Sequence, residues 1–277
     1  MRSISKILLH PDKVIRYLNR KCLEAYIAAI TPDDAVRSIR SGPLKGKKWI
    51  YGSGCLNFFL GTYESEIADT FIKYAKKSNV IYDLGAHVGY YTLLASKYVS
   101  HQGEVCAFEP LPRNIFYLRK HMELNKISNV RIFDSAISDI NGIVEFREVD
   151  DDQAGTLCSD SIMSHKVGSI KTNSISLDEF LFRNENNRPP QLVKMDVEGA
   201  EYGALKGGEK LLDEYHPTIF LSTHNCHSKG IHRRCSDFLE NLGYEISYFD
   251  LHKRITEMDD PWYEVLAEYR LSDQPKR

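Results

Sequence analysis

The sequence has no apolar run that approaches the roughly 18 residues of a membrane-spanning helix. The run Ile7–Leu9 is soon ended by Pro11 and is too short for the core of a signal peptide. Neither sign of charge is in large excess: the formal net charge is −2 and the pI is near 6.6. Such a balance gives no overall attraction to nucleic acid or to an anionic membrane. We therefore expect a cytoplasmic protein with no transmembrane segment and no nucleic-acid partner.

Cysteine is present at six positions, but no Cys-x-x-Cys pair occurs. A disulfide framework is therefore not indicated in a chain of this length, and buried thiols are the simpler interpretation. One stretch gathers potential zinc ligands, namely His224, Cys226, His227, His232 and Cys235. Their spacing matches no closed zinc motif, so we predict no metal site.

The length of 277 residues, with 42% hydrophobic and 27% charged residues, fits one main globular domain with an appendage. We place an N-terminal extension over residues 1–57 and the main domain over residues 58–277. The extension contains an apolar stripe at four-residue spacing, typical of an amphipathic helix over 11–30. We expect that helix to dock on the core or on a second copy of the chain. Docking on a second copy would make a homo-oligomer. The alternative is that the basic face of the helix makes peripheral contact with a membrane. A short strand is predicted over 49–51.

Strands alternate with helices from Val80 onward. We predict strands over 80–83, 104–108, 130–134, 192–196 and 218–223, and helices over 90–98, 112–125, 200–205 and 231–242. Two further strands, 244–251 and 263–269, have no helix between them and indicate a closing antiparallel hairpin. This order predicts an α/β fold with a mostly parallel, seven-stranded, Rossmann-like sheet and helices on both faces. A long insertion separates the third and fourth core strands; it holds a strand over 143–148 and a polar stretch over 149–164.

The stretch Val80–Thr92 has the pattern of a buried strand, a tight turn and a helix. Gly85 and Gly89 let the backbone turn sharply and approach a ligand. The third glycine of the dinucleotide fingerprint is missing, which weakens a nicotinamide interpretation. A second strand ends in Glu109 about twenty residues further on, where a carboxylate would grip a ribose diol. Together the two features indicate a nucleotide-like cofactor.

Polar residues follow every core strand. Parallel sheets bind ligands beyond the carboxyl ends of their strands, so these residues are expected to share one site. The polar ones are Asp83, Glu109, Asp134, Ser135, Asp196, Glu198 and His224, and Gly85, Pro110 and Ala136 lie among them at the strand ends.

Five short blocks resemble the FkbM-like family of S-adenosylmethionine-dependent methyltransferases, in that family's order. They are Asp83-Leu84-Gly85-Ala86-His87-Val88-Gly89-Tyr90-Tyr91-Thr92, Phe108-Glu109-Pro110, Ser135-Ala136-Ile137-Ser138-Asp139, Ser176-Leu177-Asp178-Glu179 and Lys194-Met195-Asp196-Val197-Glu198-Gly199-Ala200-Glu201. The resemblance covers about residues 58–224 and implies a class I methyltransferase fold with S-adenosylmethionine as cofactor. The sequence departs from the family at His87, where Asn is common, and at Ser222, where Glu is common.

The resemblance implies a role for each motif residue. Gly85 and Gly89 would line the methionine part of the cofactor, Glu109 would hold the ribose hydroxyls, and Asp134, Ser135 and Ala136 would border the adenine. Further cofactor contacts are assigned to Asp83, Ala86, His87, Tyr90, Tyr91, Pro110 and Asp196. Tyr63 and Glu64 either lie over the cofactor as part of a lid or belong to the start of the following helix, where a carboxylate favours the helix terminus.

Methyl transfer to a hydroxyl requires that the hydroxyl lose a proton. His224 is the first candidate for the base, because imidazole titrates near neutral pH. Asp196 and Glu198 would orient it or act in its place. FkbM-like enzymes methylate hydroxyls of sugars and natural products, so a saccharide or another small molecule is the expected acceptor. The alternatives are an NAD(P)-dependent oxidoreductase and a catalytically inactive nucleotide-binding module.

Overall fold

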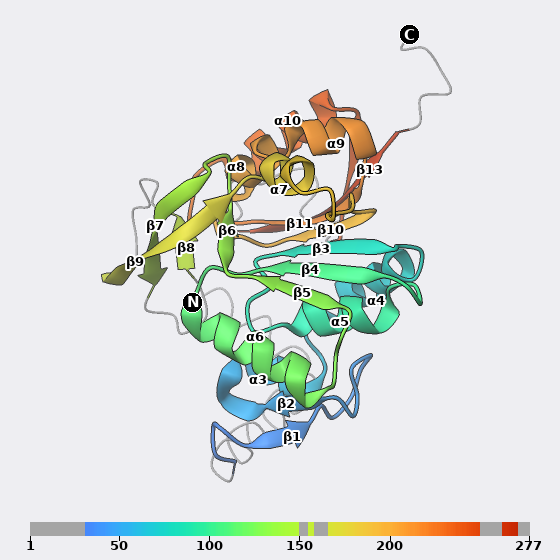
Figure 1. The fold of residues 1–277 in the computed structure, drawn as a ribbon, viewed down its shortest axis with the longest axis vertical. Coiled ribbons are helices and arrows are strands. Elements are labelled where there is room, and N and C mark those ends of the chain that lie inside the picture. Colours follow the sequence, from blue (N-terminus) through green and yellow to red (C-terminus); the bar gives the residue numbers. More distant parts are fainter. Residues whose placement is uncertain (1–30, 150–154, 158–165, 250–261, 271–277) are drawn as a thin grey trace, which may run out of the picture.

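The computed structural model describes residues 31–149, 155–157, 166–249 and 262–270. A seven-stranded sheet runs through the middle of the molecule (Figure 1). Its strands follow the order β12 (Tyr244–Tyr248), β13 (Tyr263–Tyr269), β11 (Thr218–Thr223), β10 (Leu192–Met195), β3 (Val80–Leu84), β4 (Glu104–Phe108) and β5 (Val130–Phe133). The strands from β11 to β5 pair in parallel, whereas β13 is antiparallel to both β11 and β12. The predicted sheet and its closing hairpin are confirmed.

Helices cover both faces of this sheet (Figure 1). One face carries α4 (Ser65–Ala75), α5 (Tyr90–Tyr98) and α6 (Pro112–Leu124), and the other carries α7 (Leu177–Arg183), α8 (Glu201–Lys206), α9 (Glu209–Tyr215) and α10 (Ile231–Asn241). Side chains of strand β3 pack on both faces of the sheet: Ile81 belongs to one apolar cluster, and Val80 and Tyr82 belong to the other. A strand buried on both faces is mostly apolar, which explains the run from Val80 to Tyr82; the buried Asp83 is the exception.

Local signals in the sequence set several helix boundaries. Helix α5 begins after Gly89, whose φ of 95° lies in the left-handed region that glycine tolerates. Helix α6 has Pro112 in its first turn, where the missing N–H costs nothing. The Ser176 side chain caps α7 by accepting a hydrogen bond of 3.2 Å from the Glu179 N–H. The predicted helices are therefore present, with ends that differ by a residue or so.

A second sheet of four strands occupies the long insertion. It is ordered β6 (Ser135–Ile137), β9 (Lys166–Ile175), β7 (Gly142–Val149) and β8 (Gly155–Leu157). Only β7 was predicted as a strand. The interpretation of residues 149–164 as a polar loop is wrong for β8, and β9 was missed, because both strands are defined by pairing with β7.

The segment before the main sheet includes β1 (Val36–Ser38), β2 (Lys48–Ile50), the 3-10 helix η1 (Tyr51–Ser53) and α3 (Leu56–Leu60). Strand β2 is fixed to α6 by side chains. The indole of Trp49 stacks on the His121 ring at 3.8 Å, and the Ile50 N–H donates to His121 Nε2 at 3.1 Å. The Asn125 side chain accepts from the Lys48 N–H and donates to the Lys48 carbonyl, both at 2.8 Å. The segment is thus packed onto the helix that follows Glu109.

The amphipathic helix predicted over 11–30 lies outside the described residues, as do residues 250–251 of the predicted hairpin. Within the described ranges, every helix is too short or too polar to span a bilayer.

Candidate active site

A cavity of about 320 Å³ opens at the carboxyl ends of β3, β4 and β10. Most of the residues that the sequence assigned to a cofactor line it. They are Tyr63, Asp83, Gly85, Ala86, His87, Tyr90, Tyr91, Glu109, Pro110, Ser135, Ala136 and Asp196, joined by Glu198 from the catalytic set. Its volume lies within the range of roughly 300–1,000 Å³ that small-molecule sites occupy.

Gly89 and Asp134 were assigned to the cofactor but do not line the cavity. A Cβ on Gly89 would lie 2.6 Å from Leu118 Cδ1, so this glycine allows α6 to pack closely against the start of α5. The Asp134 carboxylate forms an ion pair of 2.6 Å with Arg119, and about half of each side chain is exposed. The structure thus uses Gly89 for helix packing and places the Asp134 side chain at the surface.

Tyr63 lines the cavity, whereas Glu64 does not and lines a separate surface pocket. Glu64 occupies the position before α4 with a left-handed φ of 41°, and its side chain makes no cap hydrogen bond. Instead the Tyr91 hydroxyl donates to Glu64 Oε2 at 2.7 Å. The two residues therefore have different surroundings: the tyrosine forms part of the wall and the carboxylate supports Tyr91.

The turn after β3 is held against the turn after β10. Gly85 has a φ of 78°, and a Cβ there would lie 1.8 Å from the carbonyl oxygen of Asp196. Only glycine allows this approach. The N–H groups of Gly85 and Ala86 both donate to the Phe108 carbonyl, at 3.0 and 2.9 Å. The turn is consequently fixed to both neighbouring strands.

Glu109 is almost fully buried and is oriented by three hydrogen bonds. Its Oε2 accepts from the His87 N–H at 2.8 Å, and its Oε1 accepts from the Leu111 N–H at 2.9 Å and from Asn114 Nδ2 at 3.3 Å. Burial raises the pKa of this carboxyl to about 7, although the hydrogen bonds lower it. A carboxylate has about four lone-pair sites, so one acceptor site on Oε2 remains for a ligand.

Asp83 lies below the turn and is also buried. Its carboxylate accepts a hydrogen bond of 2.5 Å from the Thr92 hydroxyl at the start of α5. Burial raises the pKa of Asp83 to about 6, while Thr92 and Lys194 oppose that rise. Asp83 therefore ties the strand to the helix at the floor of the cavity.

Lys194 lines the cavity and was missed by the sequence interpretation. Its Nζ is fully buried; it donates to Ser222 Oγ at 2.8 Å and lies 3.4 Å from Asp196 Oδ2. Burial disfavours the charge, but Asp196, Glu264 and other carboxylates raise the pKa of the ammonium. Ser222 in turn donates to Glu264 Oε2 at 2.7 Å. A lysine inside the apolar strand β10 was the signal that could have revealed this charged group.

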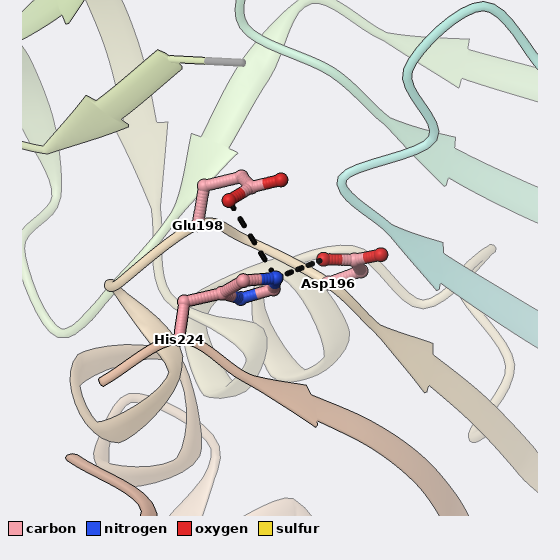
Figure 2. A group of neighbouring side chains, drawn as sticks. All are labelled: Asp196, Glu198 and His224. Carbon is pink, nitrogen blue, oxygen red and sulfur yellow. Dashed lines mark ion pairs between the residues drawn. The ribbon is translucent and has the colours of Figure 1, made fainter. Parts of the chain in front are cut away.

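The three proposed catalytic residues converge at the rim (Figure 2). Asp196 and Glu198 follow β10, and His224 follows β11. The His224 Nε2 atom lies 3.7 Å from Asp196 Oδ1 and 3.6 Å from Glu198 Oε2. His224 itself does not line the cavity, so it contacts the site through these two carboxylates.

A fourth residue fixes the orientation of His224. The carboxylate of Glu201, at the start of α8, lies 2.9 Å from Nδ1 and is fully buried. The same Glu201 oxygen accepts from the Gly199 N–H at 2.9 Å. Burial by itself lowers the pKa of His224, but the hydrogen bond to Glu201 and the charges of Asp196 and Glu198 raise it to about 10. The surrounding carboxylates therefore favour a positive charge at this imidazole.

The remaining potential zinc ligands of this region do not gather around one point. His227 Nε2 lies 3.1 Å from Glu198 Oε2. The His232 ring is buried, stacks on Tyr263 at 3.8 Å and lies within hydrogen-bond distance of two hydroxyls. Cys235 is buried in the apolar core and Cys226 is exposed.

Three polar atoms of the cavity wall are withdrawn from solvent and have no hydrogen-bond partner within the part of the chain that the structure describes. They are His87 Nε2, the Tyr90 hydroxyl and Asp196 Oδ1. Buried polar groups are normally paired, so unpaired ones in a cavity indicate a bound molecule with complementary polar atoms. Burial lowers the pKa of His87 to about 4, and its ring is therefore neutral. These groups and Glu109 suit a ligand that carries several polar atoms, such as a nucleoside.

A parallel sheet closed by an antiparallel hairpin, with a nucleoside-sized cavity at its carboxyl edge, defines the class I methyltransferase fold. Residues 83–246, more than half of the chain, match the Methyltransferase FkbM domain family. The chain belongs to this family, and it is a methyltransferase.

Individual relatives share low sequence identity with this chain. The chain is 26% identical over 186 residues to Methyltransferase 1 of Beauveria bassiana, which covers 60% of this chain and 72% of that protein. It is 28% identical over 147 residues to the hexuronic acid methyltransferase AglP of Haloferax volcanii, covering 52% and 56%. The solved FkbM methyltransferase of Methylobacillus flagellatus is 19% identical, with a TM-score of 0.46, and the match covers 77% of this chain and 52% of that one.

Proposed function

We propose that the chain is an S-adenosylmethionine-dependent O-methyltransferase that acts on a hydroxyl of a saccharide or a saccharide-containing molecule. The observation that carries this proposal is the buried, pre-oriented Glu109 carboxylate beside unpaired polar atoms of the cavity. A carboxylate that keeps a free acceptor site at the end of the second strand suits a ribose hydroxyl. The name of AglP, a hexuronic acid methyltransferase, supports a sugar as the acceptor.

The cofactor residues have separate tasks in this proposal. Glu109 accepts from the ribose, and Ser135 and Ala136 border the base. The turn around Gly85 holds the amino-acid end, and Tyr90 and Tyr91 present aromatic rings to the positive sulfur. S-adenosylmethionine, when bound, supplies an electrophilic methyl group.

The acceptor side is assigned to Asp196, Glu198 and His224. Methyl transfer is an in-line displacement, so the main contribution of these residues is to hold the acceptor oxygen in line. The two carboxylates line the cavity and can accept a hydrogen bond from the hydroxyl, whose proton must leave as the new bond forms. His224 contacts both carboxylates and keeps their orientation.

Calorimetry tests the cofactor assignment. We expect S-adenosylmethionine and S-adenosylhomocysteine to bind with one site per chain, and NADH to give no heat. Binding of NADH without binding of either sulfur compound would contradict the proposal. Incubation with methyl-labelled cofactor and a panel of sugars, including hexuronic acids, then tests the acceptor class. Label found on nitrogen or on a protein would contradict O-methylation of a saccharide.

A further inference from the structure

The rim of the cavity holds a compact set of potential metal ligands. One ligand atom each from Asp196, Glu198 and His224 lies within 4.8 Å of the others (Figure 2). We propose that these three residues bind a divalent metal cation at the mouth of the cavity. Cation binding is independent of the proposed function; only the further step, that the cation positions the acceptor hydroxyl, rests on it.

The spacing of the ligand atoms suits one ion. Metal–oxygen and metal–nitrogen bonds of roughly 2.0–2.2 Å place neighbouring ligand atoms about 3.0–3.6 Å apart. The measured distances from His224 Nε2 are 3.7 Å to Asp196 Oδ1 and 3.6 Å to Glu198 Oε2. Both distances lie at or just above the upper end of this range, and the three ligand atoms lie within 4.8 Å of one another, so rotation of the side chains can bring them to one ion.

Two of the three ligand atoms, His224 Nε2 and Asp196 Oδ1, face the proposed ion because the rest of each side chain is held elsewhere. The third, Glu198 Oε2, lies 3.1 Å from His227 Nε2, and a bound cation would replace that contact. Glu201 holds Nδ1 of the imidazole, so Nε2 is directed toward the carboxylates. Lys194 lies near Oδ2 of Asp196, which leaves Oδ1 facing His224. A carboxylate that orients a metal-binding histidine through its second nitrogen is a common feature of metal centres.

A second observation points to a missing partner. Asp196 Oδ1 is withdrawn from solvent, yet no described residue donates a hydrogen bond to it. An unpaired carboxylate oxygen at a buried position is costly. Three carboxylates, those of Asp196, Glu198 and Glu201, face the imidazole of His224. The other basic groups at these carboxylates are Lys194, 3.4 Å from Asp196 Oδ2, and His227, 3.1 Å from Glu198 Oε2. Neither contacts Asp196 Oδ1, so a cation would satisfy the unpaired oxygen.

The ligand set also indicates the class of cation. Two carboxylate oxygens and one imidazole nitrogen suit Mn²⁺, Fe²⁺ or Zn²⁺ better than Ca²⁺ or Mg²⁺, which prefer oxygen alone. Three protein ligands leave at least one coordination position open, as in catalytic metal sites. Because Asp196 and Glu198 both line the cavity, an ion between them borders the space where an acceptor oxygen would bind.

The test is calorimetry of the whole 277-residue chain, without a tag, after treatment with a chelator and desalting. Mn²⁺ and Zn²⁺ are titrated separately into the wild-type chain and into E198Q, H224Q and the control E179Q. Glu179 is paired with Arg183 at 2.8 Å on α7, away from the rim. We expect one site per wild-type chain, unchanged affinity in E179Q, and at least a tenfold loss in E198Q and H224Q. Thermal denaturation without metal confirms that each variant is folded.

Two results would overturn the inference. One is that neither cation binds the wild-type chain; the three residues would then be a hydrogen-bonded ion cluster with a protonated His224. The other is that E198Q binds as tightly as E179Q, which would place the ion elsewhere. Titration of the same samples with S-adenosylhomocysteine separates this proposal from the function: if the nucleoside binds and no cation does, the cation site is wrong and the cofactor assignment stands.

Discussion

Replacement of Glu109 by Gln is the sharpest test of the cofactor site, because the two side chains have nearly the same shape. The wild-type carboxylate accepts backbone hydrogen bonds on both oxygens, at 2.8 Å from His87 and 2.9 Å from Leu111. A Gln side chain can accept on one oxygen only. Its amide would therefore face the His87 N–H as a second donor, and Oε2 would no longer be available to a ribose hydroxyl.

The size of the effect follows from the hydrogen bond that is lost. Hydrogen bonds to charged groups contribute about 1.5–3 kcal/mol, so the affinity for S-adenosylhomocysteine should fall about 10- to 150-fold. The change in thermal stability should be small, because the unsatisfied N–H is offset by removal of a buried charge. That the charge is unfavourable is indicated by the pKa of about 7 for this carboxyl, which burial raises.

The assay is calorimetric titration of S-adenosylhomocysteine at pH 8, where Glu109 is ionised in the wild-type chain. E104Q is a matched control, because Glu104 begins β4, at the end away from Glu109, and is paired with Arg188 at 2.8 Å. The control should bind within twofold of the wild type. If E109Q also binds within twofold, Glu109 does not contact the ribose and the cofactor lies differently in the cavity.

Two further predictions follow from buried charges. The affinity of the wild-type chain for S-adenosylhomocysteine should rise between pH 6 and pH 8 as Glu109 ionises with its pKa of about 7, and it should stay flat in E109Q; equal pH profiles in calorimetry would contradict this. K194M should lower the stability at pH 8 by about 1–3 kcal/mol, because it leaves the partly buried carboxylates of Asp196 and Glu264 without their cation. Thermal denaturation of K194M should show a smaller loss of stability at pH 5, where carboxylates gain protons. The control K206M changes an exposed lysine and should lose little stability at either pH. A K194M chain as stable as the wild type would show that the ammonium is not needed.

The central sheet could be predicted because parallel strands buried on both faces are mostly apolar, with Asp83 of β3 and Lys194 of β10 as exceptions. Strands β4 and β11 were predicted at their exact residues, as was helix α5. Strand β9 has no such run, since it contains Gly168, Lys171 and Asn173. Its conformation is determined by pairing with β7, and strand propensity depends strongly on that kind of context.

The site could be predicted in outline but not in its supporting contacts. The polar residues after each strand do meet at one cavity, because parallel strands end at the same edge. The spacing of two glycines gives no information on which helix each of them faces, so Gly89 was assigned to the cofactor although it packs against α6. The hydrogen-bonded network of Lys194, Ser222 and Glu264 joins β10, β11 and β13. These residues are far apart in the sequence, and no sequence pattern predicts that they are in contact.

The contact between Gly85 and the Asp196 carbonyl has a consequence for engineering. The loop that would hold the methyl donor and the loop that would hold the acceptor fit together at one point, where no side chain can be inserted. A graft of the loop after β10 from another enzyme, made to change the acceptor, will fit only if its backbone follows the same path past Gly85. Such exchanges should therefore transplant both loops as one cassette.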